Sequence, residues 1–172
     1  MIELERTFLV KKLPDGLEDC RSKEIIDIYM PASEDHPKLR LRKNGGIFEI
    51  TKKHPIADDP SEQIEHTIDL TEEEYLALSA TSGKKVRKIR YQFPFGLNIA
   101  EIDVFQDTLL GLVIADFEFK SVEEKDSFAI PDFCSVDITD EEFIAGGMIC
   151  GKSYGDIEED LRRFGYEKVM IR

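Results

Sequence analysis

The chain begins with the stretch Met1-Ile2-Glu3-Leu4-Glu5-Arg6-Thr7-Phe8-Leu9-Val10, which sets the conditions for the rest of the fold. In a β-strand successive side chains point to opposite faces, so Glu3, Glu5 and Thr7 share one face. The opposite face is apolar, with Arg6 as the exception. Such a strand either exposes its charged face to solvent or lines a charged site with it.

Composition limits the classes of protein that the chain can form. The 172 residues suit one domain, residues 1–172, that is large enough to bury a core. The net charge of -13 argues against nucleic acid as a partner, because counterion release needs a basic surface. Three widely spaced cysteines fit a reducing compartment. No apolar run approaches transmembrane length and no signal-peptide core is visible, so we expect a cytoplasmic protein with no membrane partner.

Alternating charged and apolar residues recur along most of the chain, which is typical of strands in an antiparallel sheet. The hairpin Asn44-Gly45-Gly46 joins two of these strands. Residues 54–62 carry two prolines and three acids, and we expect a loop there. The predicted strands are 1–10, 23–30, 38–43, 47–53, 63–70, 86–93, 99–105 and 112–120.

Three helices are predicted, over residues 71–81, 139–150 and 153–164. The first two begin with a threonine followed three residues later by a glutamate, Thr71 with Glu74 and Thr139 with Glu142, which is the capping-box pattern. Gly165 marks the end of the third helix. We interpret residues 146–172 as a C-terminal helical extension of the single domain.

The charged faces of the strands are segregated by sign. A solvated surface normally intersperses both signs, and like charges two residues apart on one strand repel each other. Such pairs make more sense if they face a ligand. The pairs are Glu3 with Glu5, Arg40 with Arg42, Lys88 with Arg90, Glu101 with Asp103, and Asp116 with Glu118.

We therefore predict an α+β fold, a closed antiparallel eight-stranded β-barrel with a charged lumen and helices packed outside. Carboxylates clustered without His or Cys suit Mg²⁺ or Mn²⁺, and clustered Arg and Lys suit phosphate oxygens. The lumen then fits a metal-complexed polyphosphate. Its predicted carboxylates are Glu3, Glu5, Glu65, Glu101, Asp103, Asp116 and Glu118, and its predicted cations are Arg40, Arg42, Lys53, Lys88 and Arg90.

These motifs resemble those of a known family. Glu3-x-Glu5 is similar to the start of the E-x-E-x-K motif of the CYTH superfamily, the triphosphate tunnel metalloenzymes. The resemblance covers roughly residues 1–145. The later motifs follow in family order: Leu39-Arg40-Leu41-Arg42, Thr51-Lys52-Lys53, Ile64-Glu65, Lys88-Ile89-Arg90-Tyr91, Glu101-Ile102-Asp103-Val104-Phe105 and Asp116-Phe117-Glu118-Phe119.

The resemblance implies a metal-dependent triphosphatase that binds a triphosphate-containing small molecule in a tunnel with Mg²⁺ or Mn²⁺. That molecule would be inorganic triphosphate or a nucleoside or thiamine triphosphate. Glu5, Asp103 and Glu118 would be catalytic residues. By the same resemblance the metal ligands would be Glu3, Glu5, Asp103, Asp116 and Glu118, and the phosphate-binding residues would be Arg40, Arg42, Lys53, Lys88 and Arg90.

Three positions depart from the family pattern. Thr7 stands where the family has Lys, Gln63 stands where an acid often occurs, and Asp116 replaces a more usual Glu. Two alternative functions stay open: a class IV-type adenylate cyclase, which shares this scaffold, and a non-catalytic module that binds polyphosphate or nucleotide. Nothing in the sequence indicates an adenine pocket, so the cyclase ranks lower.

Overall fold

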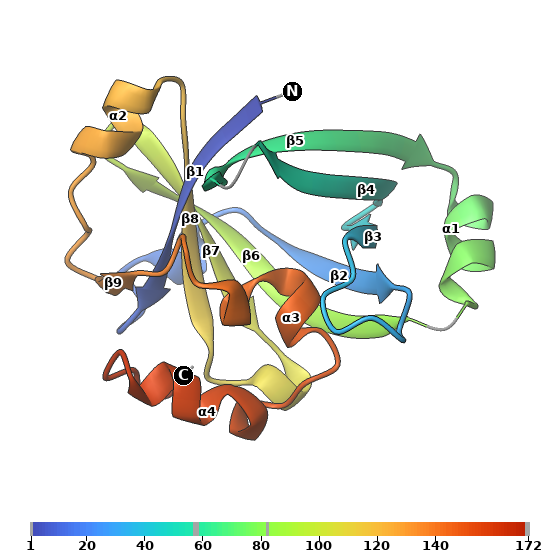
Figure 1. The fold of residues 1–172 in the computed structure, drawn as a ribbon. Helices are drawn as coiled ribbons and strands as arrows, with labels where there is room; N and C mark the ends of the chain where they lie inside the picture. The colour runs from blue at the N-terminus through green and yellow to red at the C-terminus, as the bar shows by residue number, and fades with distance from the viewer. Residues whose placement is uncertain (1, 57–58, 82, 171–172) are drawn as a thin grey trace.

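A computed structural model describes residues 2–56, 59–81 and 83–170, and within these the side chains of residues 2–3 and 53–63 lie outside the description. The described chain forms one antiparallel sheet of nine strands, in the order β5-β4-β3-β2-β6-β7-β8-β1-β9 (Figure 1). The strands are β1 (Ile2–Val10), β2 (Ser22–Met30), β3 (Leu39–Asn44), β4 (Ile47–Ile56), β5 (Asp59–Leu70), β6 (Lys84–Phe95), β7 (Asn98–Phe105), β8 (Val113–Phe119) and β9 (Cys134–Asp137).

The first strand, β1, pairs with three other strands of the sheet. β1 pairs with β8 from Leu4 to Leu9 and with β9 from Phe8 to Val10. Its first residues also pair with β5, where Ile2 lies opposite Ile64. The α+β class and the antiparallel sheet are thus confirmed, whereas the closed eight-stranded barrel is not confirmed in that form. The ninth strand, β9, is absent from the sequence prediction.

The apolar faces of the strands pack under short helices and loops. Phe8 and Phe117, from β1 and β8, contact each other edge to face at 5.8 Å between ring centroids. Phe128, which follows the helix α2 (Val122–Ser127), packs against Phe117 at 4.6 Å. This aromatic cluster fixes the apolar side of the sheet outward, and so turns the charged residues of the same strands inward.

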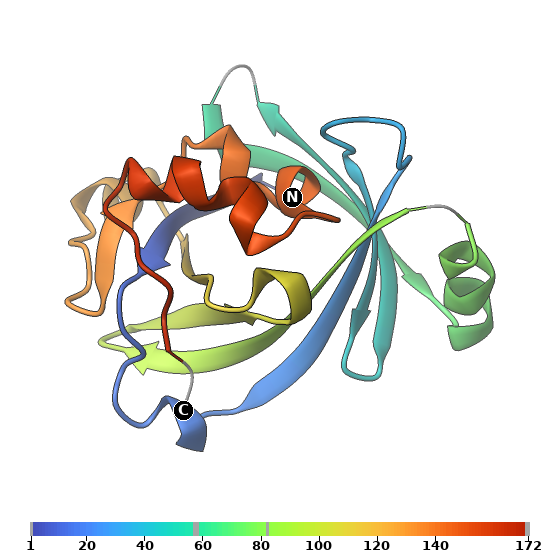
Figure 2. The same cartoon turned by 90° about the horizontal axis from the view of Figure 1, so that it is seen from below.

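Two of the three predicted helices are confirmed. In α1 (Glu72–Ser79), Thr71 and Glu74 form the predicted capping box. The helix α4 (Tyr154–Arg162) is preceded by a capping box of Ser153 with Asp156, and Gly165 follows it with a φ of 65°. Figure 2 shows α4 packed across the sheet, with α1 set apart from it. The described ranges also contain the 3₁₀ turns η1 (Leu17–Asp19) and η2 (Asp107–Leu109). Two further short elements, η3 and α3, follow later in the chain.

The predicted helix over 139–150 is wrong. This stretch contains the 3₁₀ turn η3 (Glu142–Ile144) and the one-turn helix α3 (Gly146–Ile149), separated by Ala145 in an extended conformation. The hydroxyl of Thr139 does not cap a helix, because it accepts a hydrogen bond from the Thr7 backbone N–H at 3.0 Å. Tertiary pairing with β1 therefore overrides the local capping signal.

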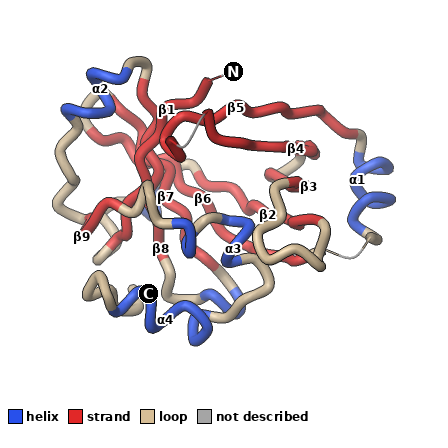
Figure 3. The backbone as a smooth tube through the Cα atoms, in the orientation of Figure 1, coloured by secondary structure: helices blue, strands red, loops and turns tan. Residues whose placement is uncertain are grey.

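The predicted loop over 54–62 is also wrong. β4 continues to Ile56 and β5 begins at Asp59, so strand covers most of this region (Figure 3). The ladder shifts register between Pro55 and Ile56. A bulge of this kind accommodates a proline, because the missing N–H costs no regular ladder bond there.

No helix among the described residues is long and apolar enough to cross a membrane.

Candidate active site

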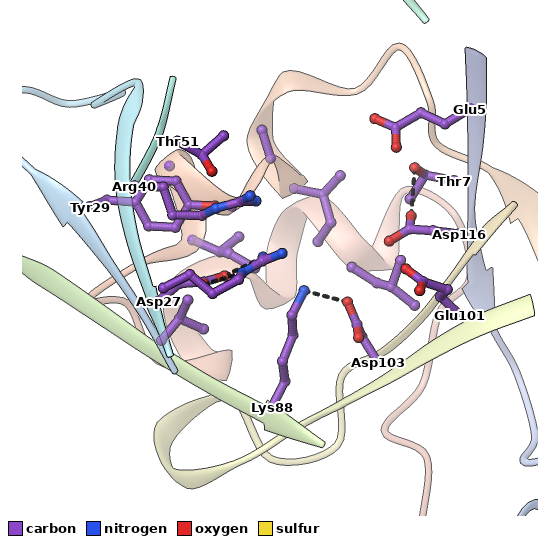
Figure 4. Close-up of a pocket in the computed structure, with 18 of the residues that line it drawn as sticks. Glu5, Thr7, Asp27, Tyr29, Arg40, Thr51, Lys88, Glu101, Asp103 and Asp116 are labelled. Atoms are coloured by element: carbon purple, nitrogen blue, oxygen red, sulfur yellow. Dashed lines mark hydrogen bonds and ion pairs between the residues drawn. The ribbon is translucent and has the colours of Figure 1, made fainter. Parts of the chain in front are cut away.

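The inward faces of the strands enclose a cavity of about 720 Å³. Figure 4 shows Glu5, Thr7, Glu101 and Asp116 on one side of it, opposite Tyr29 and Arg40. Charged groups dominate its lining. The charged side chains at the cavity are Glu5, Lys23, Asp27, Lys38, Arg40, Arg42, Glu49, Glu65, Lys88, Arg90, Glu101, Asp103, Asp116, Glu118, Asp140, Glu141 and Glu142.

One side of the cavity is an acidic wall, formed by Glu5, Glu101, Asp116 and Glu118 from the neighbouring strands β1, β7 and β8. Glu5 lies directly opposite Glu118 in the β1–β8 ladder, and Glu101 lies directly opposite Asp116 in the β7–β8 ladder. Cross-strand pairs of like charge destabilise a sheet unless a cation or a proton offsets them. The acidic wall therefore concentrates negative charge at one place.

Asp116 is the carboxylate of this wall whose environment is most clearly perturbed. Its Oδ1 accepts a hydrogen bond of 2.9 Å from the hydroxyl of Thr7, the residue opposite it on β1. Burial and the nearby charge of Asp103 raise the pKa of Asp116 above its ordinary value, against the opposing effect of Arg90. Asp116 is thus a buried carboxylate that lies close to a second negative charge.

The opposite side is a basic wall, formed by Arg40, Arg42, Lys88 and Arg90 from β2's neighbours β3 and β6. Within it Arg42 makes two hydrogen bonds to Asp27, Nε to Oδ1 at 2.7 Å and Nη2 to Oδ2 at 2.8 Å. Asp27 is only 2% exposed. Burial by itself raises the pKa of Asp27, but the Arg42 guanidinium more than offsets this and holds that pKa below its usual value.

Asp103 joins the two walls. Arg90 donates to both of its oxygens at 2.7 Å, and Lys88 donates to its Oδ2. Arg90 also pairs with Glu101 and reaches Asp116 at 3.4 Å. Burial raises the pKa of Asp103, but the charges of Arg90 and Lys88 lower it well below its usual range. Asp103 is therefore an ionised group that orients two cations.

Arg40 differs from its neighbours on the basic wall. Its Nε is buried and has no hydrogen-bond partner among the described residues. Arg40 lies opposite Tyr29 on β2 and opposite Thr51 on β4. A buried donor without a partner is costly, and an anion in the cavity would satisfy it.

The segment that includes η3 and α3 covers one end of the cavity. The Glu142 Oε1 lies 2.9 Å from His36 Nδ1, and this hydrogen bond links the segment to the loop between β2 and β3. A Cβ on Gly146 would lie 2.1 Å from the Tyr29 hydroxyl oxygen, and one on Gly147 would lie 2.5 Å from the Pro37 carbonyl oxygen. Only glycine permits this close approach.

Most of the sequence-predicted site residues meet at this cavity. The structure describes the backbone of Glu3 and Lys53, on β1 and β4, but their side chains lie outside the described residues. Glu65 and Glu101, predicted as lumen carboxylates, also line the cavity. The predicted catalytic, metal-binding and phosphate-binding residues found there are Glu5, Arg40, Arg42, Lys88, Arg90, Asp103, Asp116 and Glu118.

Comparison with known proteins identifies the family. No family model matches the chain. A protein of Nitrosomonas europaea, named inorganic triphosphatase, is 32% identical to it over 144 residues, which cover 83% of this chain and 92% of the relative. The chain belongs to the CYTH superfamily.

Solved structures agree with this CYTH assignment. A crystal structure of an inorganic triphosphatase superposes with a TM-score of 0.64 at 25% identity, covering 87% of this chain and 95% of that one. A putative adenylate cyclase from Bacillus halodurans superposes with a TM-score of 0.55 at 18% identity, over 99% and 93% of the two chains. The second likeness shows a shared fold.

Sequence reasoning missed several residues of the CYTH cavity, among them Lys23, Asp27 and Tyr29 on β2. Their inward orientation follows from strand alternation, which places these positions on one face. A signal was present at Asp27, since it is a single acid within the apolar run Ile25-Ile26-Asp27-Ile28. A lone carboxylate in such a run is buried with a partner, as Asp27 is with Arg42.

The donor atoms of the acidic wall suit a hard divalent cation. They are all carboxylate oxygens, which are the ligands that Mg²⁺ and Mn²⁺ favour. A bound cation would offset the repulsion between the carboxylates that lie opposite each other in this wall. Among the residues that the structure describes, no three acidic, histidine or cysteine side chains already converge as a metal-binding group.

Proposed function

We propose that this CYTH chain hydrolyses inorganic triphosphate. The observation that carries the proposal is the cavity with two walls of opposite charge, with an orphaned arginine donor on the basic side. A triphosphate combined with divalent cations carries both signs of charge and matches both walls. The relative of 32% identity is named for this activity, which supports the same conclusion.

The proposal includes a tunnel. β5 begins the strand order and β1 is the eighth strand in it, so the pairing of β1 with β5 brings the first and last of eight strands together. We infer that this pairing closes the sheet around the substrate, with β9 added outside the ring. A closed sheet excludes water from the sides and strengthens the electrostatic interactions inside.

The basic wall would bind the phosphate oxygens. Arg40 offers its unpartnered Nε, and Arg42, held by Asp27, presents a guanidinium in a fixed orientation. Lys88 and Arg90 are oriented in the same way by Asp103. Lys53 remains a predicted member of this group. Cations fixed in advance stabilise the developing charge on a transferring phosphoryl group without reorganisation in the transition state.

The acidic wall would hold Mg²⁺ or Mn²⁺. We assign Glu5, Asp116 and Glu118 to this role, together with the predicted Glu3. A bound divalent cation would neutralise phosphate charge and lower the pKa of a bound water. Asp103, which the sequence suggested as a further ligand, has both oxygens occupied by Lys88 and Arg90 and is better placed to orient them.

In the reaction, water attacks a terminal phosphorus and the bond to the bridging oxygen breaks. Glu5 and Glu118, opposite each other across β1 and β8, would orient this water, and one of them would accept its proton. Orthophosphate forms from the terminal group, and the bridging oxygen leaves with pyrophosphate. The arginine and lysine side chains of the basic wall would stabilise the negative charge that develops on that oxygen.

The lining favours inorganic triphosphate over a nucleotide. Its described aromatic rings are those of Tyr29, Phe105 and His36. Tyr29 packs against Gly146, and Phe105 is 4% exposed with the Lys88 ammonium 5.5 Å from its ring centroid. His36 is bonded to Glu142 and Lys38. The described lining thus offers few aromatic rings for base stacking and many charged groups for phosphate and metal.

A substrate panel tests the proposal. The purified chain is incubated with tripolyphosphate, ATP, thiamine triphosphate or pyrophosphate, with Mg²⁺ or Mn²⁺, and orthophosphate is measured. We expect tripolyphosphate to give the highest kcat/KM. Absence of turnover of every triphosphate by folded protein would overturn the proposal, and cyclic AMP with pyrophosphate from ATP would replace it with the cyclase function.

A further inference from the structure

Lys23 is a cation at the cavity that neither the charge pattern nor the family motifs assign. It lies near the start of β2 and lines the same cavity as the basic wall. Within the described part of the chain, no hydrogen bond or ion pair involves its ammonium group. Lys23 is therefore a positive charge that the folded protein leaves available.

Three cations of the basic wall, unlike Lys23, are already paired with carboxylates of the protein. Arg42 is bound to Asp27, and Lys88 is bound to Asp103. Arg90 is bound to Asp103 as well. Each of these cations has part of its charge neutralised before any substrate arrives. A substrate anion meets less competition at Lys23 than at these three groups.

The position of Lys23 in the sheet strengthens this contrast. Its Cα pairs directly with that of Arg90 on the neighbouring strand β6. Side chains opposite each other in an antiparallel ladder have Cβ atoms about 4.5–5.5 Å apart, and like charges there are destabilising. The Arg90 guanidinium is turned toward carboxylates of β7 and β8, and Lys23 has no carboxylate of its own. An anion bound beside both residues would remove the repulsion.

A second polar group at the same end of the cavity lacks a partner. Asn44 on β3 pairs with Ile25, which is two residues along β2 from Lys23. The Asn44 side-chain oxygen is buried and has no hydrogen-bond partner among the described residues. This oxygen is an acceptor, so a water that hydrates a bound anion can donate a hydrogen bond to it.

We propose that Lys23 is a substrate-binding residue, which holds a terminal phosphate of the triphosphate beside Arg90. This inference rests on the proposed function. It also accounts for the departure at Thr7, where the hydroxyl is bound to Asp116 and no ammonium group is supplied. Lys23 returns one positive charge to the cavity from a different strand.

Substitution of Lys23 tests this role through KM. In Lys23→Met we expect KM for tripolyphosphate to rise about tenfold, the loss of one charged hydrogen bond, while kcat stays within about twofold. Lys23→Arg keeps the charge and should remain close to wild type. Lys85→Met is the matched control, because Lys85 is an exposed lysine on the neighbouring strand β6.

The possible outcomes distinguish a failure of the Lys23 proposal from a failure of the proposed triphosphate hydrolysis. A KM within about twofold of wild type in folded Lys23→Met, or an equal rise in Lys85→Met, overturns the proposal. If Lys23→Met fails to fold, Lys23→Gln takes its place. If wild type hydrolyses no triphosphate, the proposed function fails, and calorimetry of tripolyphosphate binding decides on Lys23. A Kd about tenfold weaker in the variant then supports its role, and an equal Kd refutes it.

Discussion

The two walls of the cavity solve the problem of buried charge differently. On the basic wall Arg42 faces Asp27 across two strands, so a cation is paired with an anion inside the protein. On the acidic wall Glu5 faces Glu118 and Glu101 faces Asp116, so like charges face each other. The basic wall thus pairs a cation with a buried carboxylate, whereas the acidic wall sets like charges opposite one another.

This difference indicates a division of labour. Groups that are paired within the fold keep a fixed orientation, which suits the positioning of phosphate oxygens. Carboxylates that lie opposite one another concentrate negative charge, which suits metal binding. Changes on the acidic wall should therefore affect chemistry most, and changes on the basic wall should affect the fold as well.

The largest effect is expected at Glu5. In Glu5→Gln the carboxylate is lost from the acidic wall while side-chain volume is kept, and kcat for tripolyphosphate should fall about a thousandfold. Binding of tripolyphosphate, measured by calorimetry, should persist because the basic wall is unchanged. Glu73→Gln, on the exposed first turn of α1, serves as the control. Retention of more than about a tenth of wild-type kcat would remove Glu5 from the chemistry.

Substitutions in the ion pair of the basic wall should lower the free energy of unfolding. Asp27→Ala leaves Arg42 buried without its partner, and we expect the free energy of unfolding to fall by about 3 kcal/mol in urea titrations. The double variant Asp27→Leu with Arg42→Met replaces both charges and should recover most of this loss. Asp35→Ala, at an exposed acid, should change stability by less than about 0.5 kcal/mol. A double variant no more stable than the single one contradicts the pairing argument.

A smaller effect is expected where the acidic wall gains a cation. Thr7→Lys places an ammonium group opposite Asp116, in the position that the family motif assigns to Lys. The added charge should lower KM for tripolyphosphate about fivefold, which is about 1 kcal/mol. Steady-state kinetics of wild type and Thr7→Lys measure this change in KM. The variant Thr7→Val shows the effect of losing the hydroxyl alone. An unchanged or higher KM in Thr7→Lys would mean that the acidic wall tolerates Thr7 without penalty.

The smallest effect is a pH dependence of the basic wall. The pKa of Asp27 is lower in the folded chain than in the unfolded one, because Arg42 outweighs burial. Its stabilisation is therefore complete above the unfolded pKa, about 3.9, and is lost as the pH falls through the folded pKa. The stability difference between wild type and Asp27→Asn should be constant from about pH 8 to 5 and shrink by about 1 kcal/mol by pH 3. A difference that grows on acidification would reverse the sign of this argument.

The alternation of charge in the sequence predicted much of the cavity, because a period of two is enough to assign a side chain to a face. Arg40, Arg42, Lys88 and Arg90 therefore reached the cavity as expected. The alternation did not predict which carboxylate pairs with which cation inside the cavity. Which carboxylate meets Arg42 depends on the register of β2 against β3, and register is a tertiary property.

The C-terminal third of the fold was harder to predict for a related reason. Residues 139–150 carry a capping-box pattern, but the Thr139 hydroxyl is used by β1 and the helix does not form. β9 has only four residues, too few for a clear alternation. Short elements that cover a cavity take their conformation from the surface beneath them, which no local pattern describes.

Gly146 and Gly147 have a consequence for any attempt to redesign the site. At this end of the cavity the boundary is set by main chain lying directly on Tyr29 and Pro37, with no side chain between them. The two glycines have no side chain to remove, so truncation could widen the opening there only at the facing side chain of Tyr29 or His36. Larger side chains would push the covering segment away from its seat. Access for bulkier molecules would therefore have to come from a shorter side chain at Tyr29 or His36, or from a covering segment of different length.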